Sequence, residues 1–155
     1  MKIKEEGGNE LIKMLNLMPE KSHRKAVRAG INAGSQVIVS EAKKKAKQFG
    51  ESYALQKALT KKVFTDKKKN INGIVGADKN KPVEFNGKTR NAANYLHIVE
   101  FGHIGPDGNY IEGNQFLSEA ARTTQSKQLA KFEAKTKTTM DKETLKLADK
   151  LGTKR

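Results

Sequence analysis

The sequence has no cysteine, few acidic residues and no long apolar run. Without cysteine, the chain has no disulfide, no thiol nucleophile and no zinc–thiolate site, which fits a protein made in a reducing cytoplasm. No apolar run approaches the ~20 residues needed to cross a bilayer. The first residues, 1–6, also lack the apolar core of a signal peptide. These absences predict a soluble protein with no membrane partner and no cleaved export signal.

The shortage of acidic residues leaves a strongly basic chain. Lys and Arg number 31 against 17 Asp and Glu, so the net charge is +14. Such a charge favours polyanions or acidic protein surfaces as partners. The basic residues singled out as candidates for contact with DNA or a protein partner are Arg24, Arg28, Lys43, Lys44, Lys47, Lys67, Lys68 and Lys69.

This basic surface has three interpretations. Contact with DNA phosphates would give a salt-sensitive affinity that is blind to sequence. A solvated lysine face and complementarity to an acidic partner are the alternatives. Aromatic residues suited to base stacking are not interleaved with the lysines, so specific nucleic-acid recognition is not expected.

Motifs for catalysis and metal binding are also missing. The segment His97-x-x-Glu100-x-x-His103 offers three ligands, but a zincin places its two histidines at i and i+4, and Gly102 interrupts this segment. Asp107-x-Asn109 is too short for a calcium loop and predicts a turn. Neither a Ser/His/Asp order nor a phosphate-binding glycine motif is present. We therefore predict no catalytic, cofactor-binding or metal-binding residue, and no enzyme.

The spacing of apolar residues predicts several helices. The expected helices cover residues 9–17, 22–47 and 53–58, and one long helix runs from residue 115 towards the C-terminus. The first should bury Leu11, Ile12, Leu15 and Met18. The second carries a stripe of small residues, which predicts close packing against a sheet or another subunit.

Short strands are expected between the helices. Residues 60–65 and 71–77 predict a hairpin with a basic tip, and residues 78–93 predict an exposed loop or a second hairpin. Residues 102–113 read as a glycine-rich connection. The predicted fold class is α+β, with a small antiparallel sheet packed by a long helix from the first half and a long C-terminal helix. Residues 1–155 fit a single domain, with flexible ends at 1–8 and 150–155.

The order of these elements resembles a family of phage tail components, typified by the tenth gene product of phage HK-ninety-seven. The resemblance covers roughly residues 10–135 and rests on three short motifs placed in order. The first is Val39-x-Glu41-Ala42-Lys43 before Gly50. The residues of the other two motifs are Tyr95, Val99, Glu100, Phe101, Gly102, Phe116, Leu117 and Ala120.

The resemblance implies a structural virion protein of the head-to-tail junction, made in the host cytoplasm. Its partners would be neck proteins on the connector or head-closure side and on the tail-terminator side. A ring of six copies, or twelve to match the connector, would join connector to tail and let DNA pass. The small-residue helix face and residues 78–94 are the expected subunit contacts. A small basic nucleic-acid-binding protein is the alternative.

The segment Tyr95 to Gly102 is expected to anchor the fold. We predict that Phe101 is buried, with Tyr95 and Val99 packed beside it. Gly102 would free the backbone for a turn.

Overall fold

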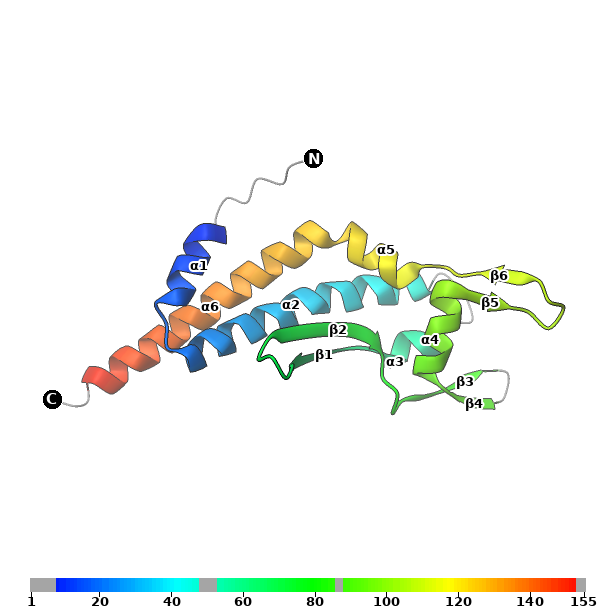
Figure 1. The fold of residues 1–155 in the computed structure, drawn as a ribbon, viewed down its shortest axis with the longest axis horizontal. Coiled ribbons are helices and arrows are strands. Elements are labelled where there is room, and N and C mark those ends of the chain that lie inside the picture. Colours follow the sequence, from blue (N-terminus) through cyan, green and yellow to red (C-terminus); the bar gives the residue numbers. More distant parts are fainter. Residues whose placement is uncertain (1–7, 48–52, 86–87, 153–155) are drawn as a thin grey trace.

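The computed structural model describes residues 8–47, 53–85 and 88–152, which form an elongated molecule built along two long helices (Figure 1). Three two-stranded antiparallel hairpins accompany the helices. The elements in chain order are α1 (Gly8–Asn16), α2 (Glu20–Lys47), α3 (Tyr53–Ala58), β1 (Leu59–Thr65), β2 (Ile71–Ala77), β3 (Pro82–Phe85), β4 (Lys88–Asn91), α4 (Ala92–Phe101), β5 (Gly102–Ile104), β6 (Tyr110–Glu112), α5 (Phe116–Thr123) and α6 (Gln125–Gly152).

Helices α2 and α6 run antiparallel and in close contact, because glycines in α2 let the two backbones approach. A Cβ built on Gly30 would lie 2.1 Å from the Thr136 hydroxyl oxygen, and one on Gly34 would lie 3.3 Å from a carbonyl oxygen of α6. An ion pair of 2.6 Å between Lys25 and Glu143 joins the same helices further along. The predicted close packing of the small-residue stripe is thus found within the chain, where its glycines contact α6.

The β1–β2 hairpin lies along the other side of α2. Gly73 faces the helix, since a Cβ there would come within 2.8 Å of Ile31 and Ser35. The guanidinium group of Arg28 donates a hydrogen bond to the Val63 carbonyl at 2.8 Å. The fold class predicted from the sequence is thus confirmed: a small antiparallel sheet is packed by long helices.

The main core lies at the end of α2, where α3, β1 and α5 meet. Its fully buried members are Ala42, Ala46, Leu55, Leu59, Phe116 and Ala120. Tyr95, Leu96 and Val99 of α4 pack against this cluster from one side. The core therefore fixes α4 and α5 relative to each other, and these two helices carry the candidate site.

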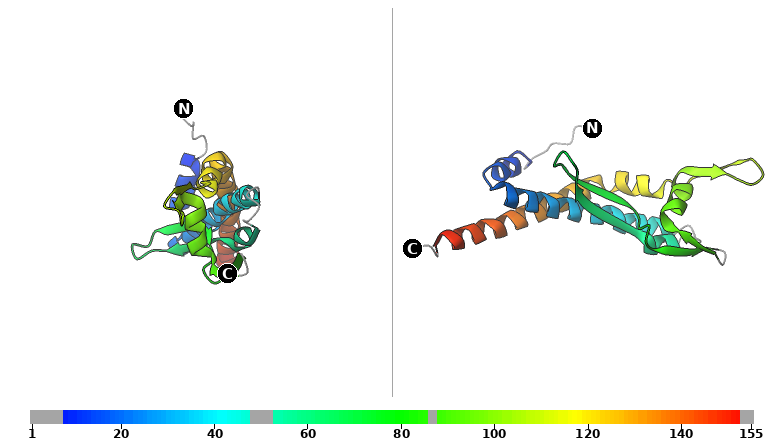
Figure 2. Two further views of the ribbon diagram at one scale, coloured as in Figure 1. Left: turned by 90° about the vertical axis from the view of Figure 1, so that its right-hand side faces the viewer. Right: turned by 60° about the horizontal axis from the view of Figure 1, so that its bottom comes forward.

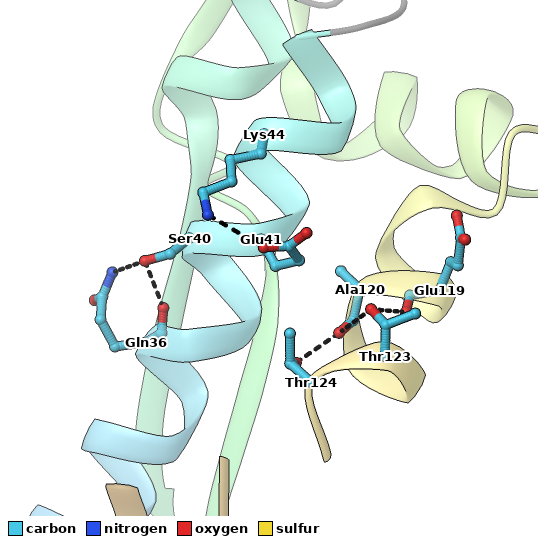
Figure 3. A network of polar contacts seen from close by, with 8 residues as sticks. All are labelled: Gln36, Ser40, Glu41, Lys44, Glu119, Ala120, Thr123 and Thr124. Atoms are coloured by element: carbon cyan, nitrogen blue, oxygen red, sulfur yellow. Dashed lines mark hydrogen bonds and ion pairs between the residues drawn. The ribbon is translucent and has the colours of Figure 1, made fainter. Parts of the chain in front are cut away.

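The predicted single C-terminal helix is wrong, because it breaks at Thr124 into α5 and α6. The Thr124 hydroxyl donates to the Ala120 carbonyl at 2.6 Å, and the Thr123 hydroxyl donates to the Glu119 carbonyl at 2.8 Å (Figure 3). Threonine hydroxyls that bond to the preceding turn compete with the helix ladder and bend helices. Thr138 and Thr139 make the same bonds inside unbroken α6, so the threonines alone do not explain the break. The break also has the Gln128 side-chain amide, which donates to the Ala121 carbonyl at 2.7 Å in place of a backbone N–H.

The structure also bears on the predictions for two loop segments, for the buried face of α1 and for the chain ends. Residues 78–93 contain the β3–β4 hairpin, and residues 102–113 form a third hairpin where only a connection was expected. In α1, Leu15 is buried, but Ile12 is 56% exposed and does not join the predicted face. Of the ends predicted to be flexible, residues 1–7 and 153–155 lie outside the described residues, whereas Gly8 begins α1 and residues 150–152 belong to α6.

Candidate assembly surface

The carboxylate of Glu100 joins the end of α4 to the start of α5. Glu100 is only 3% exposed. It accepts hydrogen bonds from the backbone N–H of Leu117 at 2.9 Å and of Ser118 at 2.8 Å, and from the Ser118 hydroxyl. The residue that precedes α5, Gln115, makes no capping bond with its own side chain. Glu100 therefore serves as the cap of α5 from a distance, and its negative charge suits the positive end of the helix dipole.

Backbone contacts close the same junction. Asn114 N–H donates to the Val99 carbonyl at 2.8 Å, and Gln115 N–H donates to the Glu100 carbonyl at 3.2 Å. Gly102 has a φ of +84°, and a Cβ there would lie 2.3 Å from the Ile111 carbonyl oxygen. The expectation that Gly102 frees the backbone is confirmed.

Residues 102–113, here called the arm, extend from this junction as the β5–β6 hairpin. The arm points away from the body of the molecule (Figure 1; Figure 2). Its register pairs Gly102 with Glu112 and Ile104 with Tyr110. At its tip, Asp107 accepts hydrogen bonds from the backbone and side chain of Asn109, which confirms the predicted turn. The arm is thus a short hairpin that is fixed firmly at its base.

The arm and its base expose an unusual amount of apolar surface. Ile104 is 73% exposed, Tyr110 64%, Phe101 59% and Ile111 48%. Single exposed apolar residues are ordinary, but here Ile104 and Tyr110 are cross-strand partners that share one face of a projecting element, as residues of an interaction site do. The prediction that Phe101 is buried is therefore wrong. In α4 the side chain of Glu100 is buried, whereas that of Phe101 is exposed. The Phe101 ring contacts the His97 ring, with centroids 5.1 Å apart and the ring planes tilted by 53°.

The remaining motif residues are either fully buried in the core or half-buried against it. Phe116 and Ala120 are fully buried, and Tyr95, Val99 and Leu117 are half-buried against the same cluster. Tyr95 and Val99 therefore pack against the core cluster and not around a buried Phe101, as had been predicted.

The charge around the arm differs from that of the rest of the chain. Residues 91–121 contain no lysine or arginine, but they contain Glu100, Asp107, Glu112 and Glu119. All 31 basic residues lie outside this stretch. Hydrogen bonds from the Asn109 side chain and backbone lower the pKa of Asp107, so this carboxylate stays ionised at neutral pH. The arm is therefore acidic and apolar, whereas the rest of the chain is basic.

The eight predicted basic contact residues do not form one cluster. Lys67, Lys68 and Lys69 are exposed at the tip of the β1–β2 hairpin, beside the first half of α2. Arg24 and Arg28 hold that hairpin in place, since the Arg24 guanidinium donates to the Lys69 carbonyl at 3.0 Å and Arg28 binds the Val63 carbonyl.

The other three basic residues lie near the end of α2. Residues 28 and 43 are about 22 Å apart along the helix at 1.5 Å per residue. Here Lys43, Lys44 and Lys47 lie around the last turns of α2, and Lys44 pairs with Glu41 at 3.5 Å (Figure 3). The structure thus separates two basic regions, one at each end of α2.

The histidines near the motif do not converge on a metal site. Within residues 8–47, 53–85 and 88–152, no group of three or more His, Asp or Glu side chains is arranged to hold a metal ion. Glu100 is committed to α5, and His103 lies on the exposed arm.

The arm is the functional feature that the sequence analysis missed. Two signals were present: Ile104 on one side and Tyr110-Ile111 on the other flank the turn Gly105 to Asn109, and the segment lacks lysine and arginine. Apolar pairs on both sides of a glycine-containing turn of a few residues predict a hairpin.

Comparisons with known proteins do not identify a relative from which a function could be inferred. No helix in the described part of the chain is both long and apolar enough to span a membrane. No protein-family model, no curated protein and no solved structure matches this chain.

Proposed function

We propose that this chain is a structural virion protein of a phage head-to-tail junction, acting in neck assembly or tail completion. The observation that carries the proposal is the arm, an exposed apolar hairpin fixed to the body by the buried carboxylate of Glu100. An element that is fixed at its base and apolar at its surface is suited to bind another protein. The order of the sequence motifs supports the phage setting.

The subunit is suited to a ring. Its acidic arm and basic body are two different surfaces, and a contact between unlike surfaces closes into a ring when the rotation between copies allows it. Six copies would match a tail, and twelve would match a connector. The partners are the connector or head-closure protein on one side and the tail-terminator protein on the other, and DNA passes through the axial hole.

The proposal assigns an assembly role and no catalytic residue or cofactor. The protein is made in the host cytoplasm and ends in the virion. Particles made without it are expected to be packaged heads and separate tails, visible by electron microscopy. Normal infectious virions from the same preparation would contradict the proposal.

A small basic nucleic-acid-binding protein is the second candidate. It is favoured by the three exposed lysines at the hairpin tip and by a cleft of 390 Å³ between α2 and α6 that is lined by Lys44, Lys127 and Lys131. This candidate predicts tight binding to DNA or RNA that weakens steeply between low and moderate salt. Filter binding at both salt concentrations, beside electron microscopy for rings, separates the two candidates.

A further inference from the structure

The outward face of the β1–β2 hairpin has a groove with the opposite character to the arm. Side chains alternate along a strand, and Lys62 is paired with Ile74, so Lys62, Phe64 and Ile74 share one face. Gly73, which contacts α2, lies on the other face. The outward face contains a groove of 610 Å³, within the range of ordinary ligand pockets.

The groove combines an apolar floor with a basic rim. Phe64, Ile74 and Ala77 line it, and Ile74 is 55% exposed. Its charged lining is Lys61, Lys62 and Lys79 with one carboxylate, Asp78, so lysines outnumber acidic groups; Lys62 and Lys79 are exposed. A surface of this kind fits an element that carries apolar side chains beside carboxylates.

The arm is such an element. Ile104 and Tyr110 are cross-strand partners on one face of the arm, which Glu112 shares, Asp107 lies at the tip, and the arm carries no lysine or arginine. Opposite charges on the two surfaces favour this pairing and disfavour contact of an arm with an arm or a groove with a groove. Within one chain the arm points away from the β1–β2 hairpin (Figure 1; Figure 2), so another copy must supply the groove.

We propose that the arm of one copy docks in the β1–β2 groove of a second copy. The face that carries Ile104 and Tyr110 enters the groove, and Asp107 and Glu112 approach Lys62 and Lys79. Each subunit then gives an arm to one neighbour and a groove to the other, which is the heterologous contact of a ring. This inference rests on the proposed function, for which it names the two surfaces that meet.

Disulfide trapping tests the contact directly, because the natural chain has no cysteine. Ile104→Cys in the arm is mixed with Ile74→Cys in the groove under mild oxidation. The control replaces the groove partner with Leu145→Cys, which lies on α6 and is 65% exposed. The mixed disulfide of arm and groove is expected in at least about tenfold excess over that of arm and α6, which corresponds to about 1.4 kcal/mol of preference.

Two results would overturn the inference. One is an equal yield of disulfide with the groove and with the α6 control. The other is a predominance of disulfides between two arm cysteines, which would mean that the arms meet each other in a symmetric contact.

Charge exchange gives a second, independent test. The double variant Asp107→Asn, Glu112→Lys keeps an acceptor for the turn but removes both negative charges of the arm. It is expected to weaken self-association by roughly tenfold or more at low salt, as measured by sedimentation equilibrium. A Lys62→Glu, Lys79→Glu groove is expected to restore binding when mixed with this variant arm. Unchanged self-association of the arm variant, or no restoration on mixing, would refute the pairing.

The arm–groove contact and the proposed function can be refuted independently of each other. The disulfide yield reports only whether the arm meets the groove. The particles made without the protein report only whether heads and tails are joined. A protein that joins heads to tails through other surfaces would give separated heads and tails in its absence, and no excess of the arm–groove disulfide.

Discussion

Replacing Glu100 with alanine is expected to destabilise the protein more than replacing its aromatic neighbour. Glu100, which is 3% exposed, is the acceptor for the backbone N–H groups of Leu117 and Ser118, and Glu100→Ala leaves both part-buried groups without it. Removing one partner of a buried hydrogen bond costs about 1–3 kcal/mol, and removing a helix cap costs about 0.5–2 kcal/mol. We therefore expect a loss of about 3 kcal/mol in the free energy of unfolding.

The matched control is Phe101→Ala. Full burial of a phenylalanine contributes roughly 1.5–3 kcal/mol, and Phe101 is 59% exposed, so its removal should cost about 1 kcal/mol or less. Glu100→Gln, which keeps one oxygen acceptor, should lie between the two variants.

Thermal unfolding followed by circular dichroism measures all three variants. For a chain of this length, 1 kcal/mol shifts Tm by about 2–4 °C, so Glu100→Ala should lower Tm by roughly 6–12 °C and Phe101→Ala by no more than about 4 °C. The reverse order would refute the reasoning. A loss of about 3–5 kcal/mol for Phe101→Ala would show that this ring is buried.

The remaining predictions concern the glycines and one ion pair. Gly113→Ala should cost about 2 kcal/mol or more in urea unfolding, because its Cβ would lie 2.4 Å from the carbonyl oxygen of residue 100. Gly108→Ala, with φ +80° but open space around it, should cost only about 1–2 kcal/mol, and equal costs would contradict the packing of the arm base. Gly30→Ala should lower Tm despite the better helix propensity of alanine, since its Cβ would overlap α6; a gain in Tm would show that the helices separate easily. The hydrogen bond from Lys25 lowers the pKa of Glu143 below its ordinary 4.5, so this contribution to stability is present above pH 4.5 and is lost as the pH falls through the lowered pKa. The Tm difference between the natural protein and Glu143→Gln should therefore vanish in acid, and a difference that persists there would refute the pairing.

Elements with long, regular patterns could be predicted from the sequence. The apolar and small residues of α2 repeat over 28 residues, and the β1–β2 strands flank a polar turn, so both elements appear where they were expected. Local spacing is enough for such elements because each buries one continuous face.

The sequence predictions were wrong where contacts between residues far apart in the chain, or side-chain hydrogen bonds, determine the structure. The choice between Glu100 and Phe101 as the buried residue depends on the unpaired N–H groups of a helix that begins 16 residues later in the chain. At the break near Thr124 the Gln128 side chain binds the Ala121 carbonyl, a contact that apolar spacing does not register. The arm was read as a connection because glycine and turn residues outnumber its few apolar ones.

Electron cryomicroscopy of the assembled neck would show whether this chain forms a ring between connector and tail. The account predicts a closed ring of this chain between connector and tail, six copies by preference and twelve as the competitor, with each arm seated on the β1–β2 hairpin of the next copy and DNA on the axis. A neck in which this chain is absent, or in which it forms no ring, would contradict the account.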